Sequence, residues 1–163
     1  MEIFSGNNAL IGLFLLVMGL GMGIMGFTLN KTQNTNKAWF AFGIFYTIGI
    51  VGILGNPFLK NWLQIPSSGK SFLPLSSIII LIIGIILSFV LGRKKDSRFV
   101  ILGILFSVGL HFLPFNTLYT YLLAIGTITN SVVAIVKPQI SIYKSITIDA
   151  CLKAGMGIVL LVL

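Results

Sequence analysis

Six long apolar stretches alternate along the chain with short polar segments. They cover approximately residues 8–29, 38–57, 71–91, 99–114, 117–136 and 146–163. A helix needs about 20 mainly apolar residues to cross a hydrocarbon core about 30 Å thick, and these stretches are close to that length. The pattern predicts an all-α integral membrane protein, a bundle of six transmembrane helices with short loops that forms a single membrane domain.

The local structure of two polar segments can be predicted in more detail. Asn116 lies just before the fifth apolar stretch, and an asparagine side chain can accept a hydrogen bond from an unpaired N–H at a helix start. We therefore expect Asn116 to be the N-cap residue of that helix. Residues 58–65, between Pro57 and Pro66, space their large apolar side chains helically. This segment fits either a short helix in the membrane interface or an irregular loop.

Composition supports the membrane interpretation. The 163 residues are 56% hydrophobic and only 9% charged, whereas soluble domains carry about 25% charged residues. Six spans use nearly all of this length, so no second, soluble domain is expected. The single cysteine, Cys151, lies in an apolar stretch and has no partner for an intramolecular disulfide. We expect it to be a packed thiol rather than a nucleophile.

The net charge of +8 predicts an orientation rather than nucleic-acid binding, because the basic residues are spread over short loops. Loops one, three and five hold Lys31, Lys37, Arg93, Lys94, Lys95, Arg98, Lys137 and Lys144. The opposite side has only Lys60 and Lys70. Since positive loops stay in the cytoplasm, both termini are expected outside the cell membrane. Anionic lipid headgroups are the expected partners of the basic loops.

A glycine face on the first span predicts close helix packing. Its members are Gly12, Gly19, Gly23 and Gly26, and their spacing places them on one side of a helix. Small residues let helix backbones approach closely in lipid. The second span has a similar set in Gly49, Gly52 and Gly55, so the two spans are expected to pack together. A contact with a second copy or with another membrane protein is the alternative.

The sixth span contains the most informative polar residues, Asp149 and Lys153. They are four residues apart and therefore lie on one helical face, close enough to pair. Each charge at a helix centre costs about 2.5–3.5 kcal/mol on insertion scales, so both are expected to face the bundle interior. Gly157 continues this face by one more turn.

Other polar residues fall at a similar depth in the membrane and extend the candidate site. They are Asn130, Thr127, Tyr46 and Ser107. These side chains fit a substrate or ion site among several spans. They also fit structural roles, in which hydroxyls bond to their own helix and Asn130 bonds to Asp149. The sequence leaves an ion path, a binding pocket and a purely structural layer open.

His111, the only histidine, lies near the outer end of the fourth span and is a candidate for the outer mouth of the site. Its side chain can change charge near neutral pH, but an interfacial histidine also serves simply as a hydrogen-bonding group. No serine-hydrolase arrangement or metal-ligand cluster accompanies it. We therefore expect no catalytic residues, no metal, no cofactor and no enzyme activity.

Two classes of function fit these features. The leading hypothesis is a small transporter or channel that moves a small solute, an ion or protons through the polar site. The alternative is an accessory, immunity or sensor protein that acts through helix contacts with a partner. Neutralising Asp149 would distinguish the two hypotheses. A transporter or channel is expected to lose flux while the protein stays folded.

Overall fold

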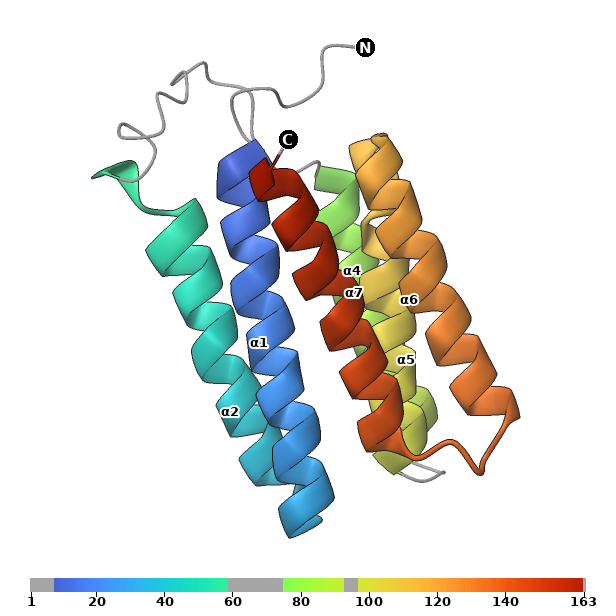
Figure 1. The fold of residues 1–163 in the computed structure, drawn as a ribbon. Helices are drawn as coiled ribbons and strands as arrows, with labels where there is room; N and C mark the ends of the chain where they lie inside the picture. The colour runs from blue at the N-terminus through green and yellow to red at the C-terminus, as the bar shows by residue number, and fades with distance from the viewer. Residues whose placement is uncertain (1–7, 59–74, 93–96, 163) are drawn as a thin grey trace. The chain divides into compact units, whose positions relative to one another are not determined.

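The computed structural model describes residues 8–58, 75–92 and 97–162 of the chain. All regular structure in these ranges is helical (Figure 1). The α-helices are α1 (Asn8–Thr32), α2 (Thr35–Thr47), α4 (Leu75–Gly92), α5 (Ser97–His111), α6 (Leu118–Val136) and α7 (Ile142–Val162). A π-helix, η1 (Ile48–Leu54), continues α2, and a 3₁₀ helix, η2 (Leu113–Phe115), follows α5.

Six helices in the described ranges are long and apolar enough to cross a membrane. Four of them are α1, α4, α6 and α7, and the other two are Asn36–Leu54 and Ser97–Phe115, each of which includes a short helix. The predicted all-α fold with six spans is therefore confirmed. The proposed interfacial helix falls almost wholly within residues 59–74, which lie outside the described residues.

The sixth span starts earlier than the apolar pattern indicates. α7 begins at Ile142, and the N–H of Ser145 already donates to the carbonyl oxygen of Ser141 at 3.3 Å. The first turn contains Tyr143, Lys144 and Ser145, so hydropathy alone places the start near residue 146. The helix therefore carries a polar turn ahead of its apolar part.

Asn116 is not the N-cap of α6, and this expectation is wrong. Thr117 takes that position, because its hydroxyl accepts from the N–H of Thr120 and the Thr120 hydroxyl accepts from the N–H of Thr117, both at 3.2 Å. Asn116 instead ends η2 in the left-handed region, with φ 54° and ψ 39°. Its side chain accepts a hydrogen bond from the Tyr121 hydroxyl at 2.6 Å.

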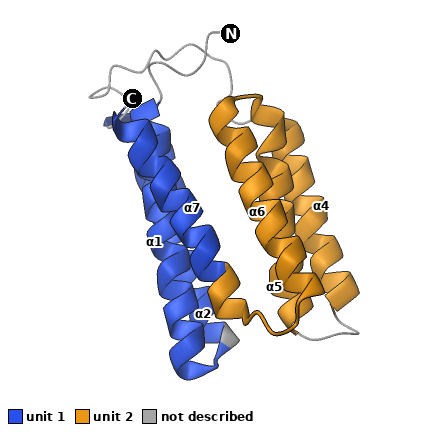
Figure 2. Ribbon diagram, turned by 45° about the vertical axis from the view of Figure 1, so that its right-hand side comes forward, with its two compact units in different colours: residues 1–69, 146–163 blue, residues 70–145 orange. Residues whose placement is uncertain are grey.

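The chain divides into two compact units (Figure 2). Unit 1 comprises residues 1–69 and 146–163, and unit 2 comprises residues 70–145. The boundary falls inside α7, after its first turn. Each unit contains its own close helix contacts.

In unit 1, α1 packs between α2 with η1 and the main part of α7 (Figure 1). On α1, Gly12 lies against Gly157, whereas Gly19 lies against Ala150 and Ala154. Positions increase along α1 as they decrease along α7, so the two helices are antiparallel. The start of α1 and the end of α7 therefore lie at the same end of this unit.

In unit 2, α4 and α5 form an antiparallel pair through two reciprocal glycine–serine contacts. Gly84 lies against the Ser107 side chain, and Gly103 lies against the Ser88 side chain. Both hydroxyls bond back to the carbonyl oxygen four residues earlier, Ser88 to Gly84 at 2.7 Å and Ser107 to Gly103 at 2.8 Å. The polar atoms are thereby satisfied inside the contact, which suits packing in lipid.

The third helix of unit 2, α6, packs on α5. Gly109 of α5 lies against Ile128 of α6. At the other end of α5, the guanidinium of Arg98 donates to the carbonyl oxygen of Ala134 and, at 3.3 Å, to that of Lys137. The Ala134 carbonyl group lies in the last turn of α6, where carbonyl groups lack helical partners, and the Lys137 carbonyl oxygen also accepts from the Ile140 N–H at 3.0 Å. Arg98 therefore holds the end of α6 to the start of α5.

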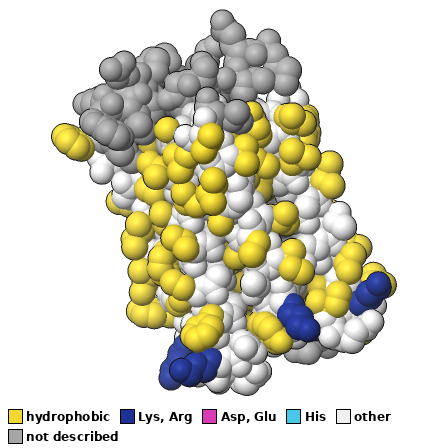
Figure 3. All heavy atoms as spheres, in the orientation of Figure 1, with side chains coloured by type: hydrophobic (Ala, Val, Ile, Leu, Met, Phe, Trp, Pro, Cys, Tyr) yellow, Lys and Arg dark blue, Asp and Glu magenta, His cyan; other side chains and the backbone are white. Residues whose placement is uncertain are grey.

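The outer surfaces of the helices are strongly apolar, as a protein surrounded by lipid requires. On α4, for example, Ile82, Ile83 and Ile86 are more than half exposed. Figure 3 shows hydrophobic side chains over the visible helical surface, while the visible Lys and Arg side chains lie at helix ends. This distribution fits helices that cross a hydrocarbon layer with their charges at its borders.

Candidate polar site in the membrane

Asp149 and Lys153 form a buried ion pair on α7. The Lys153 ammonium donates to the Asp149 carboxylate Oδ2 across one helical turn. The side chains are 0% and 2% exposed, so neither charge faces lipid. The helix itself sets this geometry, because residues four apart are neighbours on the helix surface.

The backbone of α1 runs close beside the turn that holds this pair. A Cβ atom placed on Gly19 would lie 2.7 Å from the Ala154 nitrogen and 2.8 Å from the Ala150 carbonyl oxygen. Ala150 and Ala154 directly follow Asp149 and Lys153 in the sequence. The position of the ion-pair turn in unit 1 is therefore fixed by backbone contact that only a glycine at position 19 allows.

The close contact between the backbones of α1 and α7 continues toward the end of α7. A Cβ on Gly12 would lie 2.8 Å from the Gly157 carbonyl oxygen, and a Cβ on Gly157 would lie 2.9 Å from the Leu16 nitrogen. The surface beside Gly157 is thus occupied by α1. Gly23 has more room, since among the described residues a Cβ there would meet only the Ala150 Cβ, at 4.0 Å. Gly26, the last member of the predicted face, is also buried.

For Gly12 and Gly19, the neighbouring backbone belongs to α7 and not to the second span. α1 packs on the second span through other residues. Gly21 lies against the Phe45 side chain, and a Cβ on Gly49 would lie 3.1 Å from the Phe14 ring. The periodicity that identifies the glycine face therefore does not identify the helix that fills it.

Gly49 lies within η1, a π-helical segment that no feature of the sequence predicts. In a π-helix, each N–H group donates to the carbonyl oxygen five residues earlier. The Gly55 N–H at the end of η1 donates in this way to the Ile50 carbonyl oxygen at 2.7 Å. π-helical segments are rare and occur often at functional sites. No motif in residues 48–54 distinguishes them from an ordinary apolar helix.

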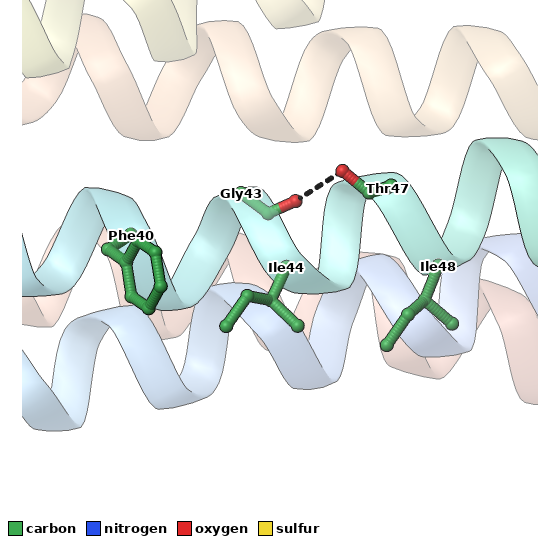
Figure 4. A pocket seen from close by; sticks show the side chains of 5 residues that line it. All are labelled: Phe40, Gly43, Ile44, Thr47 and Ile48. Atoms are coloured by element: carbon green, nitrogen blue, oxygen red, sulfur yellow. Dashed lines mark hydrogen bonds between the residues drawn. The ribbon is translucent and has the colours of Figure 1, made fainter.

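Tyr46 lies in the same unit as the ion pair, on α2. Its ring packs against that of Phe42, with the centroids 5.8 Å apart, and its side chain is 37% exposed. An open hollow of about 500 Å³ lies on the same helix (Figure 4). Its lining is Phe40, Gly43, Ile44, Thr47 and Ile48. None of these described lining residues is charged, and the Thr47 hydroxyl bonds to the Gly43 carbonyl oxygen, so this surface suits apolar contacts.

The other candidate site residues belong to unit 2. Asn130 donates through its side-chain amide to the Ser145 carbonyl oxygen at 2.8 Å, one turn before Asp149 along α7. Thr127 is fully buried, and its carbonyl oxygen accepts from the Ser131 hydroxyl at 2.8 Å. Ser107 lies in the α4–α5 contact described above. A joint site of all six predicted residues stays a prediction.

His111 lies at the end of α5, as expected from the sequence. Its ring nitrogen Nδ1 is hydrogen bonded to the Val108 carbonyl oxygen, and its own carbonyl oxygen accepts from the Ser77 hydroxyl at 2.8 Å. The rings of Phe112 and Phe115 lie beside it, with centroids 4.2 and 6.2 Å away. His111 therefore joins the ends of α4, α5 and η2.

Two buried hydroxyls lie near the start of α7 and are not among the residues predicted from the sequence. The Oγ atoms of Ser141 and Ser145 are buried and have no hydrogen-bond partner among the described residues. The available signal was their spacing, because Ser141, Ser145, Asp149 and Lys153 follow each other at intervals of four residues. Serine is common at helix starts, so two serines near the start of a span do not by themselves indicate a functional site.

The fold and this site define a polytopic α-helical membrane protein that buries a charged pair within one of its helices. More particularly, the chain belongs to a family of unknown function (DUF6609), whose model matches residues 3–163. Searches of curated proteins and of solved structures found no match to the chain.

Proposed function

We propose that this protein is a small transporter or channel, and that the ion pair of Asp149 and Lys153 is its polar intramembrane site. The observation that supports this proposal most directly is the burial of both charges in a helix of membrane-spanning length. Ionisable residues within membrane helices are rare and commonly belong to ion or proton pathways. Protons are the cargo to test first, since both side chains exchange them.

A stability role for this pair is a weaker explanation. Replacing a buried ion pair with apolar side chains of similar volume is often neutral or stabilising, so burial of charge does not by itself favour the fold. The contact between Asp149 and Lys153 also lies within α7, so this contact does not hold α7 to another helix. A functional requirement for charge accounts better for its presence.

The setting of the site is proposed from the charge distribution. We place the protein in the cell membrane with both termini extracytoplasmic and the basic loops in the cytoplasm, near anionic headgroups. Six spans support this, because an even number returns the chain to its starting side. Reporter fusions at Asp96 and at Leu163 should give cytoplasmic and extracytoplasmic signals, respectively. A cytoplasmic signal at Leu163 would refute the orientation.

The function is tested with the variants Asp149→Asn, Lys153→Met and their combination. Removing one partner of a buried pair costs about 3–5 kcal/mol, because the other charge is left uncompensated. Each single variant should therefore lower the unfolding temperature in detergent, and the double variant should recover much of the loss. Cys151→Ala, an uncharged change on the same helix, is the matched control.

Flux is then measured in proteoliposomes that contain a pH-sensitive dye, with a valinomycin-clamped potassium gradient as the driving force. We expect proton flux from the parent and the control, and none from the stable double variant. Equal flux from the double variant and the parent would show that the pair is structural. If the parent moves no protons under this driving force, proton transport is refuted and the accessory role gains support.

A further inference from the structure

The buried pair lies on a longer polar ridge of α7. Ser141, Ser145, Asp149 and Lys153 are spaced by four residues, and such positions form a continuous ridge on a helix surface. Ser141 immediately precedes the helix, and its carbonyl oxygen accepts from the Ser145 N–H at 3.3 Å, which places it in helical register. The ridge thus runs from the first turn of α7 to the ion pair.

The two serines of this ridge differ from the other buried serines of the protein. Ser88, Ser107 and Ser131 each donate to the carbonyl oxygen four residues earlier, at 2.7 to 2.8 Å. This back-bonding is the usual way in which a membrane helix satisfies a hydroxyl. The Oγ atoms of Ser141 and Ser145 are also buried, but they have no such partner among the described residues. A buried hydroxyl without a protein partner indicates a site where water binds.

The surroundings of Ser145 fit this interpretation. Its side chain is fully buried, and its carbonyl oxygen accepts a second hydrogen bond from the Asn130 amide at 2.8 Å. The adjacent Lys144 is exposed, which places the first turn of α7 at the level of headgroups and water. Ser145 therefore lies just inside the membrane border, between a solvated turn and the carboxylate of Asp149.

We infer that the hydroxyls of Ser141 and Ser145 line a narrow hydrated path that leads from the start of α7 to Asp149. Asp149 lies eight positions after Ser141, so the path is about 12 Å long. Its ligand is water, and through water it gives protons access to the carboxylate. The inference builds on the proposed site, but it requires only that water reaches the ion pair, and not that net transport occurs.

The path is tested with cysteine substitutions in a Cys151→Ala background. N-ethylmaleimide enters lipid, but it reacts with the thiolate, which an apolar environment disfavours. Ser141→Cys and Ser145→Cys keep nearly the original side-chain shape. Ile148→Cys is the matched control, because Ile148 lies one turn from Ser145 on the same helix and is 48% exposed on the apolar surface. Labelling in intact membranes is quantified by mass spectrometry.

We expect both serine-position cysteines to react roughly tenfold faster than Ile148→Cys, which corresponds to a difference of about one unit in thiol pKa. All three should react equally after denaturation. The inference is overturned if Ser145→Cys reacts no faster than the control, even where Ser141→Cys reacts readily. Fast labelling of Ser145→Cys together with absent ion flux would support the water path and refute the proposed transport, so the two failures are distinguishable.

Discussion

The contact at Gly19 makes the sharpest quantitative prediction about this fold. In Gly19→Ala, the new Cβ would lie 2.7 Å from the Ala154 nitrogen and 2.8 Å from the Ala150 carbonyl oxygen. Ordinary contacts begin near 3.4 Å, so α1 and α7 would have to separate locally by about 0.7 Å. Both obstructing atoms belong to the backbone and cannot rotate away. Overpacking of this kind costs about 1–3 kcal/mol.

Gly23→Ala provides the matched control on the same helix. Within the described part of the chain, its Cβ would meet only the Ala150 Cβ at 4.0 Å, which is an ordinary contact. Both substitutions replace glycine by alanine within α1, so the gain in helix propensity, up to about 1 kcal/mol, is common to both. The difference in stability between Gly19→Ala and Gly23→Ala therefore isolates the steric term.

The assay is thermal unfolding of the purified protein in detergent, monitored by tryptophan fluorescence and by size-exclusion chromatography. Since 1 kcal/mol shifts the unfolding temperature by about 2–4 °C in a chain of this size, Gly19→Ala should unfold about 2–12 °C below Gly23→Ala. Equal unfolding temperatures would show that α1 and α7 do not approach so closely, and the reasoning would fail.

The same substitution should also affect the ion pair. Ala150 and Ala154, which receive the clash, directly follow Asp149 and Lys153. Separation of the helices at this level would displace the turn that holds both charges. We therefore expect less proton flux from Gly19→Ala than from Gly23→Ala at a temperature where both are folded. Equal flux from the two variants would show that the contact between α1 and α7 at Gly19 does not affect the ion pair.

Three further predictions concern unit 2. Gly84→Ala should destabilise the protein by about 1–3 kcal/mol because its Cβ would overlap the Ser107 side chain, and Ser107→Gly in the same chain should restore much of the unfolding temperature. Thr117→Ala should lower the free energy of unfolding by about 0.5–2 kcal/mol, because the N-cap of α6 is lost. Asn116→Gly should lower it less in the same denaturation assay, because glycine suits the left-handed backbone at this position. Arg98→Ala should increase amide hydrogen exchange at the end of α6, because the carbonyl groups of Ala134 and Lys137 lose the guanidinium that donates to them. Arg98→Lys keeps a charged donor and should show a smaller increase.

The spans were predictable because hydropathy and helix length are coupled by the thickness of the membrane. The pattern failed where helix geometry is set by polar groups. The start of α7 lies in a polar turn, and the N-cap of α6 passes from Asn116 to Thr117 because threonine at 120 completes a reciprocal pair of hydrogen bonds. η1 was not predictable, since a π-helix buries the same residue types as an α-helix.

For the candidate site, the sequence identified contacts within a helix better than contacts between helices. The pairing of Asp149 with Lys153 follows from their spacing and is observed. The glycine face of α1 was visible as a periodicity, but its neighbour could not be read from it, because several spans carry small residues. Ser145 was not identified because a hydroxyl's hydrogen-bond partner depends on its rotamer and its surroundings, and not on its position in the sequence.

These contacts give α7 two different sides near the ion pair. Successive residues of an α-helix are about 100° apart, so Ala150 faces a direction well separated from that of Asp149. On the Ala150 side, the backbone of α1 lies so close at Gly19 that a Cβ there would be 2.8 Å from the Ala150 carbonyl oxygen. The Asp149 side carries the ridge that includes Ser145, whose hydroxyl has no protein partner among the described residues. The proposed path for water therefore follows the ridge, which lies on a different side of α7 from the close contact between Ala150 and α1.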